Sequence, residues 1–266
     1  MDATLTTPPP PAPSLSRGER AVAERLLATP APQDTFRPDM LDGLPPPARR
    51  WLTHAIAPGT PLWRAARLTM HGSIKLGGSW YPFEATQVHA PDRGMLWKAR
   101  AKMKGLPIVG HDLYLEGHGE MRWKLLGLVP VVRAEGPDVA RSARGRMAAE
   151  TFVMLPTWLV GPHVTWRDEG PEVAIARFTV DREPLEVRLE VGGDGAMKRL
   201  SFLRWGQPRP EEPFGLYPFG CEVLEERTLA GLTVPSRMRV GWFFGEARFE
   251  SEGEFFRSEL DSLRPQ

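Results

Sequence analysis

Cysteine, asparagine and net charge are what this sequence most clearly lacks. Its 266 residues include one cysteine, Cys221, and no asparagine, so intramolecular disulfides and multi-cysteine metal sites are excluded. Because 34 Lys and Arg residues nearly balance 33 Asp and Glu residues, the net charge of +1 gives no electrostatic reason to expect nucleic acid or an anionic membrane as a partner. We expect Cys221 to be a buried, unreactive thiol on a strand.

Long apolar runs and the familiar catalytic motifs are also missing. No stretch approaches the ~18 uncharged apolar residues of a membrane-spanning helix, so no integral membrane segment is expected. Residues 1–20 contain no basic region followed by an apolar one, which argues against a secretory signal and predicts a cytoplasmic location. The sequence has no nucleophile elbow, phosphate-binding loop, zinc-protease motif or dinucleotide fingerprint, and we expect no cofactor.

The N-terminal region is divided by its prolines. Residues 1–15 are polar and proline-rich, which predicts a disordered tail. Residues 16–58 are predicted to hold the N-terminal helices. The first begins with a capping box made by Ser16 and Glu19 and ends near Ala28. Prolines at the first turn and a Pro-Gly pair after the last turn bracket a second helix in this region.

Residues 59–266 change to a period of two, which is typical of antiparallel strands with one buried face. In residues 95–103, Met95 and Trp97 begin an inward row that alternates with Lys and Arg. Turn signals divide the region into roughly ten to twelve strands, the last over residues 246–256. Because an open twisted sheet of that size tends to curl, we predict an α+β, mostly antiparallel fold: a curled half-barrel with a helix in its concave face.

That helix is predicted over residues 137–155, which hold the only long helical pattern in the chain. A 100° step per residue places Met147 and Glu150 on one apolar stripe. A carboxylate on such a stripe is costly unless it is paired or protonated. Gln87, the one amide on an apolar strand face, is the predicted partner, and Arg146 lies one turn earlier on the helix.

The segment HDLYLEGHGE has the residue types of a metal site. Strand alternation places four of its polar side chains on one side: Asp112, Tyr114, Glu116 and His118. Leu113 and Leu115 alternate with them and are predicted to point into the core. We therefore interpret the polar side as a solvated outer face and predict no metal site.

Several segments together carry a resemblance to a known family. They are LPPPARRWL, WYPFEATQ, HDLYLEGHGEMRWKLLGLVPV, and RMAAE followed by Pro156. In this order the chain resembles an uncharacterised bacterial domain family of unknown function, over residues 44–260. That family is similar to the lipoprotein-carrier (LolA-like) half-barrel, a curled antiparallel sheet with helices in its concavity. The resemblance implies a cavity for an apolar ligand or a lipid and carries over no catalytic residues.

Three functions are compatible with these patterns. The first is binding of an apolar small molecule or lipid by an adaptable inward surface, against the alternative of a solid core. That surface comprises Met70, Met95, Trp97, Met103, Met121 and Trp123. The second is an enzyme that uses Glu150 as a buried acid or base, against a structural ion pair. The third is an interaction scaffold that uses the proline-rich tail.

We predict the first function and leave the oligomeric state open. The predicted ligand-binding residues are Glu150, Gln87, Trp97, Trp123, Met121 and Met147.

Overall fold

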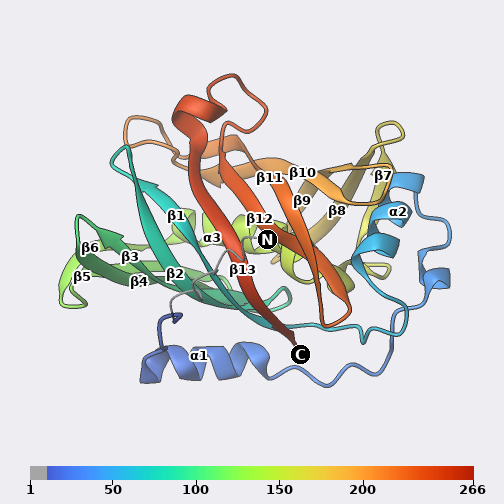
Figure 1. Cartoon of the computed structure of the whole chain (residues 1–266), viewed down its shortest axis with the longest axis horizontal. Helices are drawn as coiled ribbons and strands as arrows, with labels where there is room; N and C mark the ends of the chain where they lie inside the picture. Colours follow the sequence, from blue (N-terminus) through green and yellow to red (C-terminus); the bar gives the residue numbers. More distant parts are fainter. Residues whose placement is uncertain (1–10) are drawn as a thin grey trace, which may run out of the picture.

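One antiparallel sheet of 13 strands dominates the computed structural model, which describes residues 11–266 (Figure 1). The strands are β1 (Ala66–Leu76), β2 (Ser79–Ala90), β3 (Gly94–Met103), β4 (Leu106–Leu115), β5 (His118–Leu125), β6 (Val129–Glu135), β7 (Thr165–Asp168), β8 (Val173–Val180), β9 (Glu183–Val191), β10 (Met197–Gly206), β11 (Gly215–Leu229), β12 (Leu232–Trp242) and β13 (Glu254–Pro265). The helices are α1 (Arg17–Leu27), α2 (Pro46–Ala55) and α3 (Pro137–Met154), with shorter turns η1 (Pro38–Leu41), η2 (Pro156–Leu159) and η3 (Phe249–Gly253).

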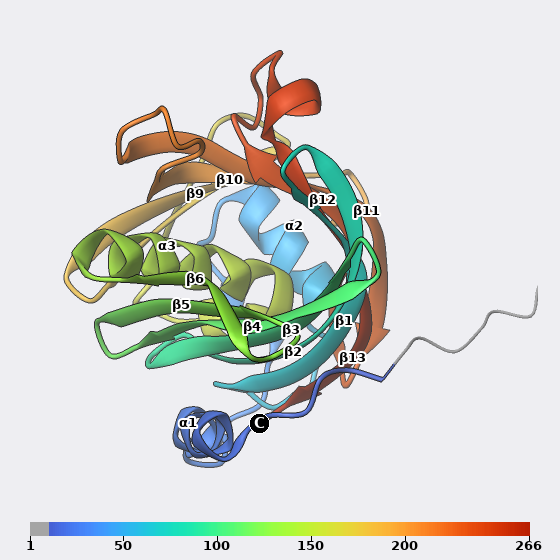
Figure 2. The same cartoon turned by 90° about the vertical axis from the view of Figure 1, so that its left-hand side faces the viewer.

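The strand order explains why α3 lies inside the sheet. The order is β6-β5-β4-β3-β2-β1-β13-β12-β11-β10-β9-β8-β7, so each strand pairs with its neighbour in sequence except where β1 meets β13. Strands β6 and β7 are consecutive in the chain but form opposite edges, and the segment containing α3 and η2 must cross between them. Figure 2 shows α3 inside the curl, between β5–β6 and β9–β10. The predicted fold class, a curled antiparallel sheet with a helix in its concavity, is confirmed.

The sheet has 13 strands rather than the expected ten to twelve, and two details differ from the prediction. Strand β6 was not among the predicted strands; it contains Pro130, which an edge strand tolerates although proline cannot donate an N–H. The final strand, predicted over 246–256, is wrong, because η3 occupies part of that stretch and β13 follows it. A register shift opposite Thr69 and Met70 interrupts the alternation of β13, which hid this strand from a period-two analysis.

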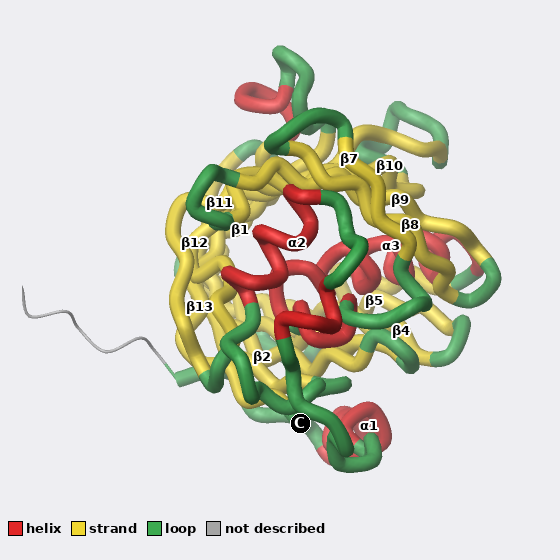
Figure 3. The backbone as a smooth tube through the Cα atoms, turned by 90° about the vertical axis from the view of Figure 1, so that its right-hand side faces the viewer, coloured by secondary structure: helices red, strands yellow, loops and turns green. Residues whose placement is uncertain are grey.

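The two N-terminal helices lie on opposite faces of the sheet. Helix α1 begins with the predicted capping box and packs on the outer face against β2 and β3. Helix α2 lies within the ring of strands, as Figure 3 shows. There Trp51 of α2 stacks on Phe152 of α3 with ring centroids 5.8 Å apart. Helix α2 therefore shares one core with the sheet and α3.

Part of the predicted disordered tail is ordered. Residues 1–10 lie outside the described residues, whereas residues 11–15 run along the outer face of the sheet. Leu15 is buried in a cluster beneath α1, and the Thr86 hydroxyl donates to the Pro13 carbonyl at 3.4 Å. The expected boundary at residue 15 is therefore wrong for these five residues.

Between residues 11 and 266, no helix combines the length and apolarity that crossing a membrane requires.

Candidate functional site

The concave face of the sheet is filled at one end and hollow at the other. At the filled end, aromatic rings of α2, α3 and β7 pack together; Phe152 and Trp166 lie 6.2 Å apart. Elsewhere a cavity of about 550 Å³ lies between α3 and the sheet. This volume falls within the roughly 300–1,000 Å³ of typical small-molecule sites.

Aromatic and methionine side chains form one wall of this cavity. Trp97 of β3 lies 5.6 Å from Trp123 of β5 and 5.9 Å from Phe83 of β2, measured between ring centroids. Met121 of β5 completes the wall. These rings face inward because alternate residues of paired antiparallel strands point to the same side. The predicted residues that line the cavity are Gln87, Trp97, Met121, Trp123 and Glu150.

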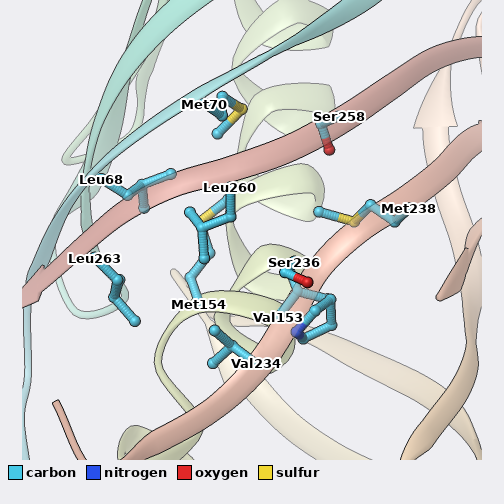
Figure 4. A pocket seen from close by; sticks show the side chains of 11 residues that line it. Leu68, Met70, Val153, Met154, Val234, Ser236, Met238, Ser258, Leu260 and Leu263 are labelled. Carbon is cyan, nitrogen blue, oxygen red and sulfur yellow. The ribbon is translucent and has the colours of Figure 1, made fainter. Parts of the chain in front are cut away.

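A small pocket adjoins this wall near the C-terminal end of α3 (Figure 4). Its volume of about 10 Å³ is too small for an organic ligand and holds at most one water molecule. Met70, Met154 and Met238 line both this pocket and the main cavity. Because methionine side chains are unbranched and flexible, this shared wall can adapt to the shape of a bound molecule.

Two predictions about sulfur-containing side chains have different outcomes. Cys221 is buried in β11, as predicted, and burial raises the pKa of its thiol to about 12. Met147 was predicted to contact the ligand, but it does not line the cavity. It is fully buried against Met95 and Tyr114 instead. A helix inside a curled sheet has neighbours on several sides, so an apolar stripe alone does not say which part faces the hollow.

A cluster of polar side chains, here called the inner cluster, lies on the cavity wall beneath α3. It consists of Gln87, Asp112, Arg146 and Glu150. Arg146 donates from Nε to Glu150 at 2.6 Å and from Nη1 to Asp112 at 2.9 Å. Gln87 donates from Nε2 to the second Glu150 oxygen at 2.7 Å. The predicted contact between Gln87 and Glu150 is confirmed, as is the pair with Arg146.

The two carboxylates of the inner cluster respond differently to their surroundings. Burial opposes ionisation of Glu150, but Arg146, His89 and Gln87 together hold its pKa below the usual range. For Asp112, burial raises the pKa despite the hydrogen bonds from Arg146 and Trp123. Glu150 is therefore ionised and forms the ion pair that holds Arg146 in place.

A second guanidinium, that of Arg204 in β10, faces the cavity and has no ion-pair partner among residues 11–266. It lies 4.5 Å from the ring centroid of Phe219 and 4.9 Å from that of Trp242, and it donates to the Ser142 hydroxyl at 3.3 Å. Its Nε is buried and has no hydrogen-bond partner in the described structure. Burial and the nearby charge of Arg146 lower the pKa of Arg204 to about 9.

The predicted solvated face of HDLYLEGHGE is wrong for Asp112 and Tyr114, whereas Glu116 and His118 are exposed as predicted. Asp112 lines the cavity, and Tyr114 is buried and donates to the Asp181 carboxylate. The alternation misled because α1 covers the outer face, so Leu113 is buried there. His118 is exposed at the start of β5. Within residues 11–266, no three or more His, Cys, Asp or Glu side chains are grouped to hold a metal ion.

Sequence reasoning also missed Arg204, although a signal was present. In β10, Leu200 and Phe202 are buried on the same face as Arg204. A charged residue on an apolar strand face is the pattern that singled out Glu150 on α3. Applied to every predicted strand, the same test identifies Arg204 as a candidate site residue.

A family model for DUF6544, a family of unknown function, matches residues 34–251. No match was found among curated proteins. Among solved structures, the chain is similar to a domain described as an outer membrane lipoprotein-sorting protein from Vibrio parahaemolyticus, with 11% identity, a TM-score of 0.42, and coverage of 77% of this chain and 86% of that one. A LolA superfamily protein from Nitrosomonas europaea gives 9% identity, a TM-score of 0.38, and coverage of 76% and 85%. A DUF1329 family protein from Desulfovibrio piger gives 12% identity, a TM-score of 0.37, and coverage of 92% of both chains. These likenesses are too distant to transfer a ligand or an activity.

Proposed function

The chain belongs to DUF6544, a family of unknown function, and from this premise we propose that it binds an apolar or lipid-like molecule in the cavity beneath α3. One observation carries the proposal: a hollow of about 550 Å³ in the place where a solid core would otherwise lie. The cytoplasmic location stays a prediction.

The size of the hollow argues against the solid-core alternative. Protein interiors are close-packed, with few voids larger than a water molecule. This hollow borders the surface at β6, so its apolar wall is in contact with solvent when no ligand is bound. A ligand whose apolar body covers that wall removes the apolar surface from water, which favours binding by roughly 25 cal/mol per Å².

The cavity has an apolar entrance. Val131 and Val132 of the edge strand β6 line it and are 48% and 42% exposed, and Phe214 before β11 lines it and is 40% exposed. These side chains belong both to the cavity wall and to the surface, so they border an opening. An apolar molecule can enter along this border without crossing a ring of charges.

The alternative of an enzyme that uses Glu150 has less support. Both Glu150 oxygens already accept hydrogen bonds, from Arg146 and Gln87, and the low pKa keeps the group ionised. A general acid at neutral pH needs a raised pKa instead. This geometry favours a structural role for Glu150. The scaffold alternative depends on a tail that lies largely outside the described residues.

Binding of an apolar fluorescent probe tests the proposal. The wild-type protein should bind the probe saturably with one site per chain, and Trp97→Ala and Met121→Ala should each change the affinity because both side chains form the wall. Lys124→Ala is the matched control, since Lys124 is exposed on the other face of β5. A folded wild-type protein without saturable binding would favour a solid core.

A further inference from the structure

Hydrogen-bonding capacity in the cavity is unevenly distributed. Each carboxylate oxygen of the inner cluster already accepts a bond: those of Glu150 from Arg146 and Gln87, and those of Asp112 from Arg146 and Trp123. The buried polar atoms left without partners are mainly donors. Among the cavity-lining residues they are Arg204 Nε and Trp97 Nε1, together with one acceptor, Gln87 Oε1.

Arg204 is the unmatched donor that carries a charge, and its position is fixed. Phe219 and Trp242 lie against its guanidinium, and Ser142 of α3 accepts one of its bonds. No carboxylate in the described part of the chain lies within 4.0 Å of it, although 34 Lys and Arg residues in the sequence are matched by 33 acidic ones. Arg204 is partly buried and its Nε is fully enclosed, and such a cation is costly unless something else supplies the counter-charge.

We propose that the cavity selects a single-chain amphiphile with an anionic carboxylate head group, which pairs with Arg204 while the apolar chain lies along the wall formed by Trp97, Trp123 and Met121. This inference rests on the proposed function and adds the chemical class of the ligand. Arg offers a planar fork of donors that matches a carboxylate, and such charge-assisted bonds are stronger than neutral ones. A neutral head group would leave the charge of Arg204 without a counter-charge, and a cationic one would be repelled by it.

The charged groups around Arg204 support this choice. Burial and the guanidinium of Arg146 on α3 lower the pKa of Arg204 to about 9, while Glu150 on α3 and Asp112 on β4 oppose them. The two carboxylates act on Arg204 at a distance, because both are bonded to Arg146. A ligand carboxylate in direct contact would stabilise the charged form of Arg204 and match its free donor.

Displacement of the apolar probe by three amphiphiles with the same sixteen-carbon chain tests the inference. Palmitate is anionic, hexadecanol is neutral and hexadecylamine is cationic. Because a hydrogen bond to a charged group contributes about 1.5–3 kcal/mol, wild-type protein should prefer palmitate over hexadecanol by about 10- to 150-fold. In Arg204→Met the affinity for palmitate should fall to that for hexadecanol, while hexadecanol binding stays within about threefold of wild type.

The matched control is Arg199→Met, since Arg199 lies on the outer face of the same strand and should keep the preference for palmitate. If Arg204→Met does not fold, Arg204→Gln repeats the comparison. Equal binding of palmitate and hexadecanol by wild-type protein, tightest binding of hexadecylamine, or a preference that survives loss of Arg204 would each overturn the inference and leave the apolar site standing. If no amphiphile displaces the probe and the probe itself does not bind, the proposed function fails as well.

Discussion

Two consecutive residues of β4 belong to two different clusters of charged side chains. The clusters differ in whether all of their polar and charged groups have a partner within the protein. Asp112 faces the cavity and belongs to the inner cluster, whereas His111 faces outward. The cluster on that outer side, here called the outer cluster, consists of Glu19, Lys98, His111 and Glu120. Both clusters join a helix to the sheet, α3 on the inside and α1 on the outside.

The outer cluster is closed. His111 contacts Glu19 at 2.8 Å through Nδ1 and Glu120 at 3.0 Å through Nε2, and Lys98 donates to Glu19 at 2.8 Å. The hydrogen bonds from His111, Lys98 and Ser16 outweigh burial and hold the pKa of Glu19 below its usual range. Every charge here has a partner from the chain, which is what a purely structural contact requires.

The inner side is open by comparison. The inner cluster leaves Gln87 Oε1 without a hydrogen-bond partner, and Arg204 nearby has a buried donor and no ion pair within residues 11–266. Two neighbouring residues of one strand thus lead to one region where the chain satisfies its own charges and another where it does not. We infer that the unsatisfied side is the one that awaits a ligand.

Breaking the inner cluster should have the largest effect on stability. Glu150→Ala leaves the Gln87 amide and one Arg146 donor unmatched, and should lower the free energy of unfolding by about 1–3 kcal/mol. Urea unfolding followed by circular dichroism measures this loss. A thermally neutral Glu150→Ala would mean that the carboxylate is in water and the inner cluster does not stabilise α3.

Glu150→Gln separates structure from function at the same position. It keeps the size and one acceptor, so the fold and the binding of the apolar probe should both be retained. Loss of probe binding in a folded Glu150→Gln protein would instead assign Glu150 an anchoring or proton-transfer role in the site.

A smaller effect is expected from titration of the outer cluster. Burial opposes protonation of His111, but its hydrogen bonds to Glu19 and Glu120 raise the pKa above the usual value. A raised folded-state pKa gives stability that is complete below the unfolded value of about 6.5 and is lost as pH rises through the folded value. Hydrogen exchange of the α1 amides should therefore speed up over that range, and His111→Gln should remove the pH dependence. An α1 whose exchange follows only the intrinsic pH dependence would contradict this account of the outer cluster.

The sequence predicts most of the sheet and one contact of the site. Alternation identified the inward rows of β1 to β3, and Gln87 and Glu150 were paired in advance because each is a polar residue on an apolar face. Alternation of apolar and polar residues did not predict which side chains face inward in β4, where both faces of the sheet are covered. Helix α1 buries Leu113 on the outer side, which hid the inward position of Asp112. The period of a strand cannot show which face a distant helix will cover.

The outcome for the cavity is similar. The inward rows of methionine and tryptophan could be predicted from the period-two alternation of the strands. Whether these rows enclose a hollow depends on how strongly the sheet curls and on the distance between α3 and the sheet. Neither quantity is local to any segment. Strand β6 and the bulge in β13, which set the edges and the join of the sheet, were likewise outside the reach of alternation.

Native mass spectrometry of the wild-type chain with added hexadecanol tests the central claim most directly, because it needs no head-group interaction and counts bound molecules. The account predicts one adduct per chain that saturates and is lost under denaturing conditions. A spectrum that contains only the bare chain, or a growing series of adducts without saturation, would show that the space beneath α3 is not a ligand-binding cavity.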